Sequence, residues 1–235
     1  MKNKIQISAL VLSLILLYSC KKVDNNNPTV LTDKDGNVYN TVTIGTQTWL
    51  TENLKTTKYS DGTEIPNITD NTAWAALTTG AYCDYSNIPA NSTTYGRLYN
   101  WYTVDNNAAT KVASNGGKNV CPTGWHVPTD AEWTILTACL GGEIDAGGKL
   151  KETGTTHWQS PNEGATDLVG FTALPSGYRY FNGSFLDIGY YSYWWSSTES
   201  SPTNAYERLV SYVSSYIYKG SGRKQSGFSV RCLKD

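Results

Sequence analysis

One stretch of this chain predicts its fold best: Cys121-Pro122-Thr123-Gly124-Trp125-His126-Val127-Pro128-Thr129-Asp130-Ala131-Glu132-Trp133. Thr129, followed three residues later by Glu132, has the pattern of a capping box, in which each side chain accepts from a free backbone N–H of the other residue. A helix is therefore predicted to begin at Thr129. Pro128 and Trp133 hold the positions of a hydrophobic staple, so we expect Trp133 to pack inward.

Apolar residues continue this predicted helix at helical spacing. Trp133, Leu136 and Leu140 indicate one buried face, and Gly141-Gly142 predicts the end of the helix, because glycine is common just past a helix terminus. Residues 121–124 precede it with the composition of a turn. We interpret Thr129, Glu132 and Trp133 as structural residues.

The N-terminus has the features of a signal peptide. Two lysines precede an apolar run over residues 7–18, which is too short for a stable membrane span. Leu17-Tyr18-Ser19-Cys20 resembles a bacterial lipobox, in which Cys20 becomes the lipidated N-terminus; the alternative is an ordinary cleaved signal that ends near a cysteine. We predict a signal peptide over residues 1–19, a lipidated flexible tether over 20–30 and an outer-membrane lipoprotein that faces the periplasm or the cell surface.

Composition narrows the class of partner. The chain has 235 residues, with 19 Lys and Arg against 20 Asp and Glu, so no basic field is available to hold nucleic acid. Its 8 Trp and 17 Tyr far exceed its 4 Phe. Aromatic rings with a polar group suit binding surfaces, because one end is apolar and the other can form hydrogen bonds.

The rest of the chain, residues 31–235, has no linker or low-complexity tract and is interpreted as one domain. Alternating apolar residues predict a hairpin over residues 38–50. Residues 72–77 fit a helical turn, residues 98–104 fit a helix or a strand, and residues 144–150 fit a short helix weakened by two glycines. From residue 170 onward the pattern predicts short strands: 171–174, 177–181, 190–196, 205–212, 216–219 and 227–232.

Besides Cys20, the chain has four cysteines, in a compartment where disulfides persist. Cys83, Cys121, Cys139 and Cys232 allow three pairings, and the sequence alone does not choose among them. Cys139 falls on the inner face of the predicted helix, where a buried free thiol is the simpler interpretation. We favour a Cys121–Cys232 disulfide, which would add about 4 to 5 kcal/mol in the chain-entropy model.

Several motifs together resemble a known family. They are Gly36-Asn37-Val38-Tyr39, residues 44–49, Glu52-Asn53-Leu54, residues 95–101, Cys121 to Trp133, Gly177-Tyr178-Arg179, residues 194–199 and Gly227-Phe228-Ser229-Val230-Arg231-Cys232. The set resembles the Fibrobacter succinogenes major paralogous domain, which is common in lipoproteins of Bacteroidetes-type bacteria. More distantly, residues 124–133 resemble a segment of formylglycine-generating enzymes, which have a C-type-lectin-like fold.

The resemblance implies an α+β, C-type-lectin-like single domain of antiparallel sheets with few short helices and a loop-rich C-terminal half. It also implies that the first strand, near residues 38–44, pairs with the last strand, near 228–232.

The activity of those enzymes does not follow from the resemblance. They hold copper with a pair of cysteines late in the chain, whereas only Cys232 follows Cys139 here. His126 and His157 are too few for a three-histidine metal centre, and His126 is interpreted as structural. No serine or cysteine has a recognisable base, and the spacing of the carboxylates pairs none of them. We predict no catalytic residues, cofactor or metal, and an oxidase is the least favoured alternative.

The tyrosine-rich segment over residues 178–218 is the predicted binding region. It contains nine tyrosines and nine serines, a composition typical of antibody paratopes. Strand alternation implies that about half of its rings point into the core. We interpret the domain as a binding module for a glycan or protein ligand; the alternative is a structural or assembly lipoprotein of the envelope. The ligand-binding candidates are Tyr190, Tyr193, Trp194, Trp195, Arg208 and Tyr212.

Overall fold

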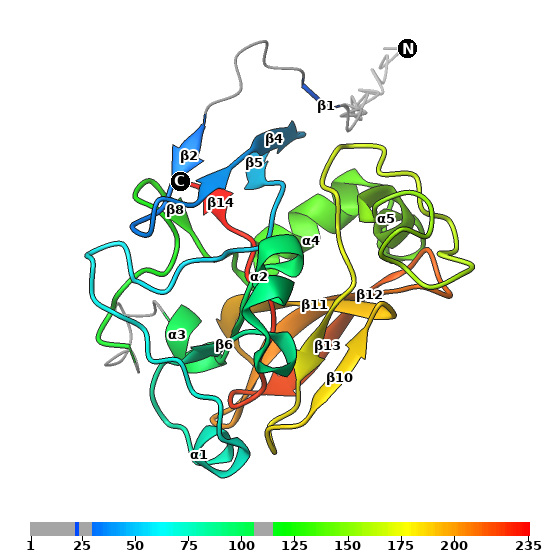
Figure 1. The fold of residues 1–235 in the computed structure, drawn as a ribbon. Helices are drawn as coiled ribbons and strands as arrows, with labels where there is room; N and C mark the ends of the chain where they lie inside the picture. The colour runs from blue at the N-terminus through cyan, green and yellow to red at the C-terminus, as the bar shows by residue number, and fades with distance from the viewer. Residues whose placement is uncertain (1–21, 24–29, 106–114) are drawn as a thin grey trace, which may run out of the picture.

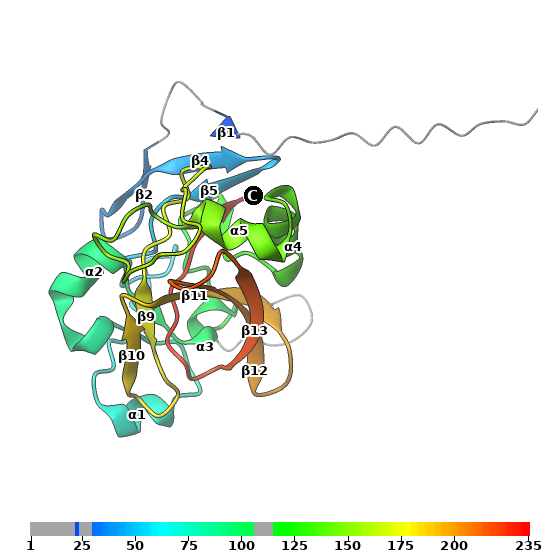
Figure 2. The same ribbon diagram turned by 90° about the vertical axis from the view of Figure 1, so that its right-hand side faces the viewer.

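The computed structural model describes residues 22–23, 30–105 and 115–235 (Figure 1). The predicted signal peptide and the lipidation site at Cys20 lie outside these residues. Two five-stranded sheets, with two helices between them, form an α+β domain (Figures 1 and 2). No helix in these ranges is long and apolar enough to cross a membrane.

The first sheet has the strand order β1-β4-β5-β14-β8, and all its pairs are antiparallel. The predicted hairpin is confirmed as β4 and β5, which turn at Gly45 with a φ of 61°. A small separate hairpin of β2 and β3 precedes it. The strands are β1 (Lys22–Val23), β2 (Leu31–Thr32), β3 (Val38–Tyr39), β4 (Thr41–Ile44), β5 (Gln47–Leu50), β8 (Trp125–His126) and β14 (Leu233–Lys234).

The first hairpin and the last strand meet in this sheet, although the last strand does not pair with the predicted partner. Leu233 of β14 pairs with Trp49 of β5, and the Leu50 N–H donates to the Cys232 carbonyl at 3.1 Å. The partner of the last strand is therefore the second strand of the hairpin, not the first. The free edge of β4 is taken by β1, so this short part of the predicted tether lies against the domain.

The second sheet has the order β10-β9-β11-β12-β13. It is antiparallel except for the contact between β9 and β11, where Ser192 pairs with Gly177 in parallel. Four predicted runs form β9, β11, β12 and β13, whereas β10 was not predicted. Its strands are β9 (Ser176–Arg179), β10 (Phe185–Ile188), β11 (Tyr191–Glu199), β12 (Asn204–Ser211) and β13 (Ile217–Arg223).

Two of the predicted strands, residues 171–174 and 227–232, form only isolated bridges. In the second of them, Gly227, Phe228 and Ser229 pair in succession with Arg179, Tyr99 and Trp194. The segment touches three different neighbours one after another, so no continuous ladder develops. It threads between the elements of the domain instead of extending one sheet.

The stretch from Cys121 to Trp133 folds as predicted. Helix α4 (Asp130–Cys139) begins at Thr129, whose side chain accepts from the Glu132 N–H at 3.2 Å. The Glu132 carboxylate accepts from the Thr129 N–H at 2.8 Å, which completes the capping box. Trp133 is fully buried, 4.8 Å from the ring of Trp49. The structural interpretation of these three residues is confirmed.

Helix α5 (Glu143–Leu150) follows α4, and both helices lie between the two sheets (Figure 2). Its two glycines are required by close backbone contacts. A side chain at Gly147 would collide with the Tyr216 carbonyl, and one at Gly148 with the Gly164 carbonyl. This packing offsets the cost of about 1 kcal/mol that each glycine imposes on a helix.

Short elements form the rest of the domain, with α1 at the bottom of Figure 1 and α2 near its centre. The predicted helical turn is α1 (Asn71–Ala75). The ambiguous residues 98–104 adopt both structures, first β7 and then α3, because Asn100 caps α3 by accepting from the Thr103 N–H at 3.2 Å. The elements are β6 (Tyr82–Cys83), the 3₁₀ turn η1 (Tyr85–Asn87), α2 (Pro89–Tyr95), β7 (Leu98–Tyr99) and α3 (Trp101–Val104).

The cysteines follow the prediction in part. Cys121 and Cys232 form a disulfide with a Cα–Cα distance of 5.9 Å and a sequence separation of 111, as predicted. Cys139 is half-buried at the end of α4 and is disulfide-bonded, so the prediction of a buried free thiol there is wrong. The buried free thiol is Cys83, and burial raises its pKa to about 12.

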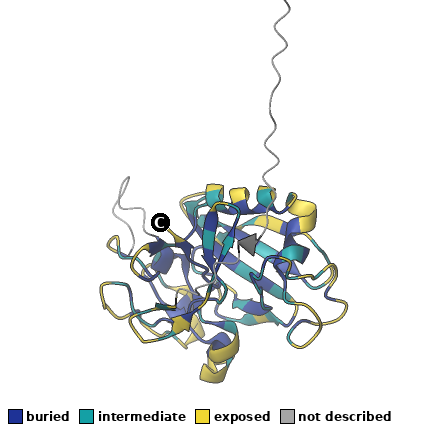
Figure 3. Cartoon of the chain, turned by 90° about the horizontal axis from the view of Figure 1, so that it is seen from above, coloured by how far each residue is buried: buried dark blue, intermediate teal, exposed yellow. Residues whose placement is uncertain are grey.

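Buried positions gather in the strands, with exposed positions on the loops (Figure 3).

Candidate ligand-binding site

Trp194 and Trp195 are buried, so the prediction that they contact a ligand is wrong. Trp194 and Trp195 are 0% exposed. The ring of Trp194 lies 5.9 Å from those of Trp133 and Phe171, and the Trp195 indole N–H donates to the Tyr99 carbonyl at 2.8 Å. Adjacent residues of a strand point to opposite faces, so both rings are buried only because β11 is covered on both faces.

Arg208 is also buried, and it joins β12 to the beginning of α4. Its guanidinium lies 2.8 Å from the Asp130 carboxylate, which Lys219 contacts at 2.7 Å. Burial of Asp130 opposes ionisation, but hydrogen bonds from Lys219 and Arg208 outweigh it and hold the pKa of Asp130 below its ordinary value. Because its charge is used inside the domain, Arg208 is a structural residue and the prediction of a ligand contact is wrong.

The remaining predicted tyrosines fall into two groups. Tyr190 and Tyr212 lie together, with ring centroids 5.1 Å apart, and Tyr190 is 42% exposed. Tyr193 lies on another surface, where its ring is 4.6 Å from that of Tyr178 and stacks on Phe228 at 5.1 Å. The predicted set is therefore not one site, and Tyr193 lines a groove that contains none of the other five candidates.

This groove is a hollow of about 360 Å³ on the face of the second sheet that points away from α4 and α5. We call it the aromatic groove. Tyr193 of β11 and Leu209 of β12 pair across the sheet and form part of its floor. Its walls are rings from β9, from the β9–β10 loop and from the segment after β13: Tyr178, Tyr180, Phe181 and Phe228.

One carboxylate, Glu207 of β12, lines the aromatic groove. The residue is 7% exposed, and its Oε2 atom has no hydrogen-bond partner. Burial raises the pKa of Glu207 to about 7. No salt bridge reaches it from any residue in the described ranges, although a buried unpaired carboxylate is costly and rare.

Two glycines of β13 make room for this carboxylate. Glu207 pairs with Gly220 in the ladder, and a side chain there would collide with Glu207 Oε1. A Cβ atom on Gly222 would lie 2.8 Å from Glu207 Oε2 and 2.7 Å from the Phe228 ring. The carboxylate therefore lies close over the bare backbone of β13, at the edge of the ring wall.

Polar groups also line the aromatic groove. Arg223 stacks on Phe181, with its guanidinium carbon 4.6 Å from the ring centroid. Burial raises the pKa of Tyr178 to about 12 and also raises that of Tyr193, so both hydroxyls stay protonated at neutral pH. The other polar residues of the lining are Asn204, Ser221 and Ser226.

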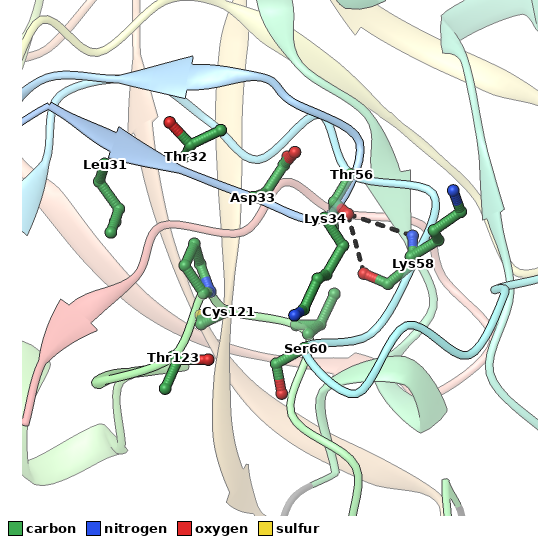
Figure 4. A pocket seen from close by; sticks show the side chains of 11 residues that line it. Leu31, Thr32, Asp33, Lys34, Thr56, Lys58, Ser60, Cys121 and Thr123 are labelled. Atoms are coloured by element: carbon green, nitrogen blue, oxygen red, sulfur yellow. Dashed lines mark hydrogen bonds between the residues drawn. The ribbon is translucent and has the colours of Figure 1, made fainter.

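A second hollow, of about 200 Å³, lies between the β2–β3 hairpin and the turn at Cys121 (Figure 4). Two of its polar side chains, Asp33 and Thr56, already have partners. The Asp33 carboxylate accepts from the Tyr39 hydroxyl at 2.7 Å, and the Thr56 hydroxyl donates to the Lys58 carbonyl at 2.8 Å. With these groups satisfied inside the chain, the hollow offers a ligand less than the aromatic groove does.

A third hollow, of about 290 Å³, borders the buried residues Asn53 and Arg231. The Arg231 Nε and the Trp194 indole N–H both donate to Asn53 Oδ1, at 2.7 and 2.9 Å. Three of the sequence motifs thus meet at Asn53. The residues are engaged with one another, which indicates a structural role.

Potential metal ligands and histidines lie among the described residues. No three His, Cys, Asp or Glu side chains gather there as ligands. His126 bridges Glu132 Oε1 at 3.0 Å and Asp235 Oδ1 at 2.7 Å, and hydrogen bonding to Glu132 is the main reason that its pKa is raised. This contact ties the capping box to the chain end, in agreement with the structural interpretation of His126.

Sequence reasoning missed Glu207 and most of the rings around it. One signal was present: Gly220-Ser221-Gly222 lies inside the last long strand, and glycine within a strand marks the close approach of another group. Nothing local indicated which side chain approaches. The strand pairing that brings Glu207 to Gly220 supplies that information.

Comparisons with known proteins support the motif analysis. No curated protein and no solved structure matches the chain. The family model described as the Fibrobacter succinogenes major domain matches residues 42–234, a range that contains both sheets except β1, both long helices and the aromatic groove. The chain therefore belongs to the Fibrobacter succinogenes major domain family.

Proposed function

We propose that this protein is a lipoprotein of the cell envelope whose C-type-lectin-like domain is a non-catalytic binding module. Its ligand, a glycan in preference to a protein, binds in the aromatic groove. The observation that carries the proposal is a single surface that combines four aromatic side chains of the wall, Tyr193 and an unpaired carboxylate. Aromatic rings offer flat apolar faces to sugars, and polar groups at the rim can bond hydroxyls.

Two matched tyrosines test the location of the site. Tyr180 in the aromatic groove is 38% exposed and Tyr190 outside it is 42% exposed, so alanine at either position should disturb the fold to a similar small extent. The wild-type chain from residue 20 onward and both variants are applied to a glycan array. We expect Tyr180→Ala to weaken the strongest signals about tenfold, as for the loss of an aromatic contact, and Tyr190→Ala to leave them unchanged.

Each other outcome contradicts part of the proposal. Loss of binding in Tyr190→Ala alone would move the site to the Tyr190–Tyr212 pair. An absence of signal from the folded wild-type chain, on the glycan array and on a matching protein array, would favour a structural or assembly lipoprotein. Near-ultraviolet circular dichroism verifies that each variant keeps its tertiary packing.

The lipid anchor is tested separately. Cells that express the full chain are grown with an alkyne-bearing fatty acid, which labels lipoproteins covalently. We expect label on the wild-type protein and none on Cys20→Ala. Equal labelling of the two would contradict the proposed anchor without affecting the proposed binding site.

A further inference from the structure

The aromatic groove contains one buried ionisable group that lacks a partner among the described residues. Glu207 is buried, and its Oε2 accepts no hydrogen bond. The neighbouring charge on β12, Arg208, is equally buried but has Asp130 as its partner. Ionised carboxylates in protein interiors are normally paired, because an unpaired charge there costs several kcal/mol. A partner for Glu207 is therefore missing from the described part of the chain.

The nearest basic side chain of the lining does not supply that partner. Arg223 stacks on the Phe181 ring, and burial alone accounts for the raised pKa of Glu207, with no contribution from a neighbouring cation. Gly220 and Gly222 accommodate the carboxylate, because a Cβ atom at either position would collide with one of its oxygens. The site is thus built to hold an acid without an internal base.

The surroundings of Glu207 favour a cation over an anion or a neutral group. Tyr178, Tyr193 and Phe228 form one continuous ring cluster beside it, with centroid distances of 4.6 to 5.8 Å. The faces of aromatic rings attract cations, most strongly where water is excluded. A carboxylate beside such rings matches an ammonium group, which would also restore the ionised form of Glu207 by charge pairing.

The polar rim narrows the ligand further. Tyr178, Tyr180 and Tyr193 bring hydroxyl groups to the lining as donors and acceptors. Ser221 and Asn204 also line the groove, but their side chains already bond to Ser200 and Thr203 within the chain. A simple alkylammonium would leave the tyrosine hydroxyls without use, whereas a sugar presents hydroxyls around its ring. We propose that the aromatic groove recognises a sugar that carries a free amino group, with the ammonium at Glu207 and the ring against the tyrosine wall. This inference rests on the proposed function, since it names the ligand class of the same site.

Two oligosaccharides that differ only in acetylation test the inference. Isothermal titration of the chain from residue 20 onward compares a glucosamine tetramer with an N-acetylglucosamine tetramer at neutral pH. We expect the free amine to bind at least about tenfold more tightly, the size of effect typical of a hydrogen bond to a charged group. Glu207→Gln keeps the shape of the side chain and removes its charge, so it should abolish this preference.

The controls separate this inference from the proposed function. Glu143→Gln removes the same charge from an exposed position at the beginning of α5 and should leave the preference intact. If both tetramers bind equally, Glu207→Gln changes neither and Tyr180→Ala weakens both, the binding site stands and the amino-sugar inference is wrong. If neither tetramer binds the folded wild-type chain, the inference is also wrong, and the glycan array alone decides the proposed function.

Discussion

Arg231 and Glu207 are both buried charged side chains, but their surroundings are opposite. Arg231 donates to Asn53 Oδ1 and to the carbonyls of Leu50 and Phe171 at 2.7 to 3.0 Å, with a longer contact of 3.2 Å to the Thr172 carbonyl. Glu207 has an oxygen with no partner at all. The comparison separates a charge that holds the scaffold together from a buried carboxylate without a partner, which we propose is the ligand contact.

The environment of Arg231 explains why a full set of partners matters there. Its guanidinium binds backbone from β5 and from residues 171–172, segments far apart in the sequence. Asn53 adds the Tyr95 carbonyl, to which its side chain donates at 2.9 Å. A planar group with five donors suits this position, because it can satisfy several carbonyls at once.

The largest expected effect is the loss of stability when Arg231, whose hydrogen bonds are satisfied inside the chain, is replaced. Arg231→Met keeps much of the side-chain volume but removes the guanidinium donors to three carbonyls and one of the two donors to Asn53 Oδ1. We expect the free energy of unfolding to fall by about 3 to 5 kcal/mol, the range for removal of one member of a buried charged network. Urea denaturation measures this loss. Arg223→Met, at an exposed position, is the matched control and should change stability by about 0.5 kcal/mol or less.

A smaller effect is expected from Glu207, whose carboxylate has an unpaired oxygen: the free energy of unfolding should depend on pH. Burial raises the pKa of Glu207 from 4.5 to about 7, so between these values the folded chain binds more protons than the unfolded chain. The free energy of unfolding should therefore fall as the pH rises through this window, by about 3 kcal/mol in total. Glu207→Gln cannot ionise and should lack this component.

The two proteins are compared by urea denaturation at several pH values between 4 and 8. Other titrating groups contribute equally to both curves, so the difference between the curves isolates Glu207. Curves that run parallel across the whole range would show that Glu207 is not a strained buried acid, and would weaken the contrast with Arg231.

The smallest effect is expected at the edge of the Arg231 network. The Ser229 hydroxyl accepts from Asn53 Nδ2 at 3.2 Å and donates to the Ser176 hydroxyl at 2.9 Å, in a buried position. Ser229→Ala should lower the free energy of unfolding by about 1 kcal/mol, as for one buried hydrogen bond. Thermal unfolding detects this change. Ser221→Ala, at an exposed position on the rim of the aromatic groove, should be neutral; an equal loss at both positions would contradict the assignment of Ser229 to the scaffold network.

Some parts of this fold are encoded by residues close together in the sequence. The beginning of α4 depends on Thr129 and Glu132, three residues apart, and the β4–β5 hairpin depends on alternation around one turn. The family was also identifiable from local motifs, since each is a short string. The exact partner of the last strand was not, because Leu233 and Trp49 are distant in the chain.

The candidate site shows the limit of the alternation rule. Alternation predicted that half of the rings along residues 190–195 face inward, whereas Trp194 and Trp195 are both buried although they point to opposite faces. Strand β11 is central in its sheet, with α4 packed on one face and Phe228 covering the other. A single strand pattern contains no information about what covers its second face.

The family, the α+β class and the helix capped by Thr129 could be predicted from the sequence, because capping, turns and periodicity act over a few residues. Which of the tyrosine and tryptophan rings are accessible, and the position of Glu207 over Gly220 and Gly222, became known only from the tertiary structure. That arrangement joins β9, β11, β12, β13 and Phe228, so it depends on pairing and packing between distant segments, which no local pattern specifies.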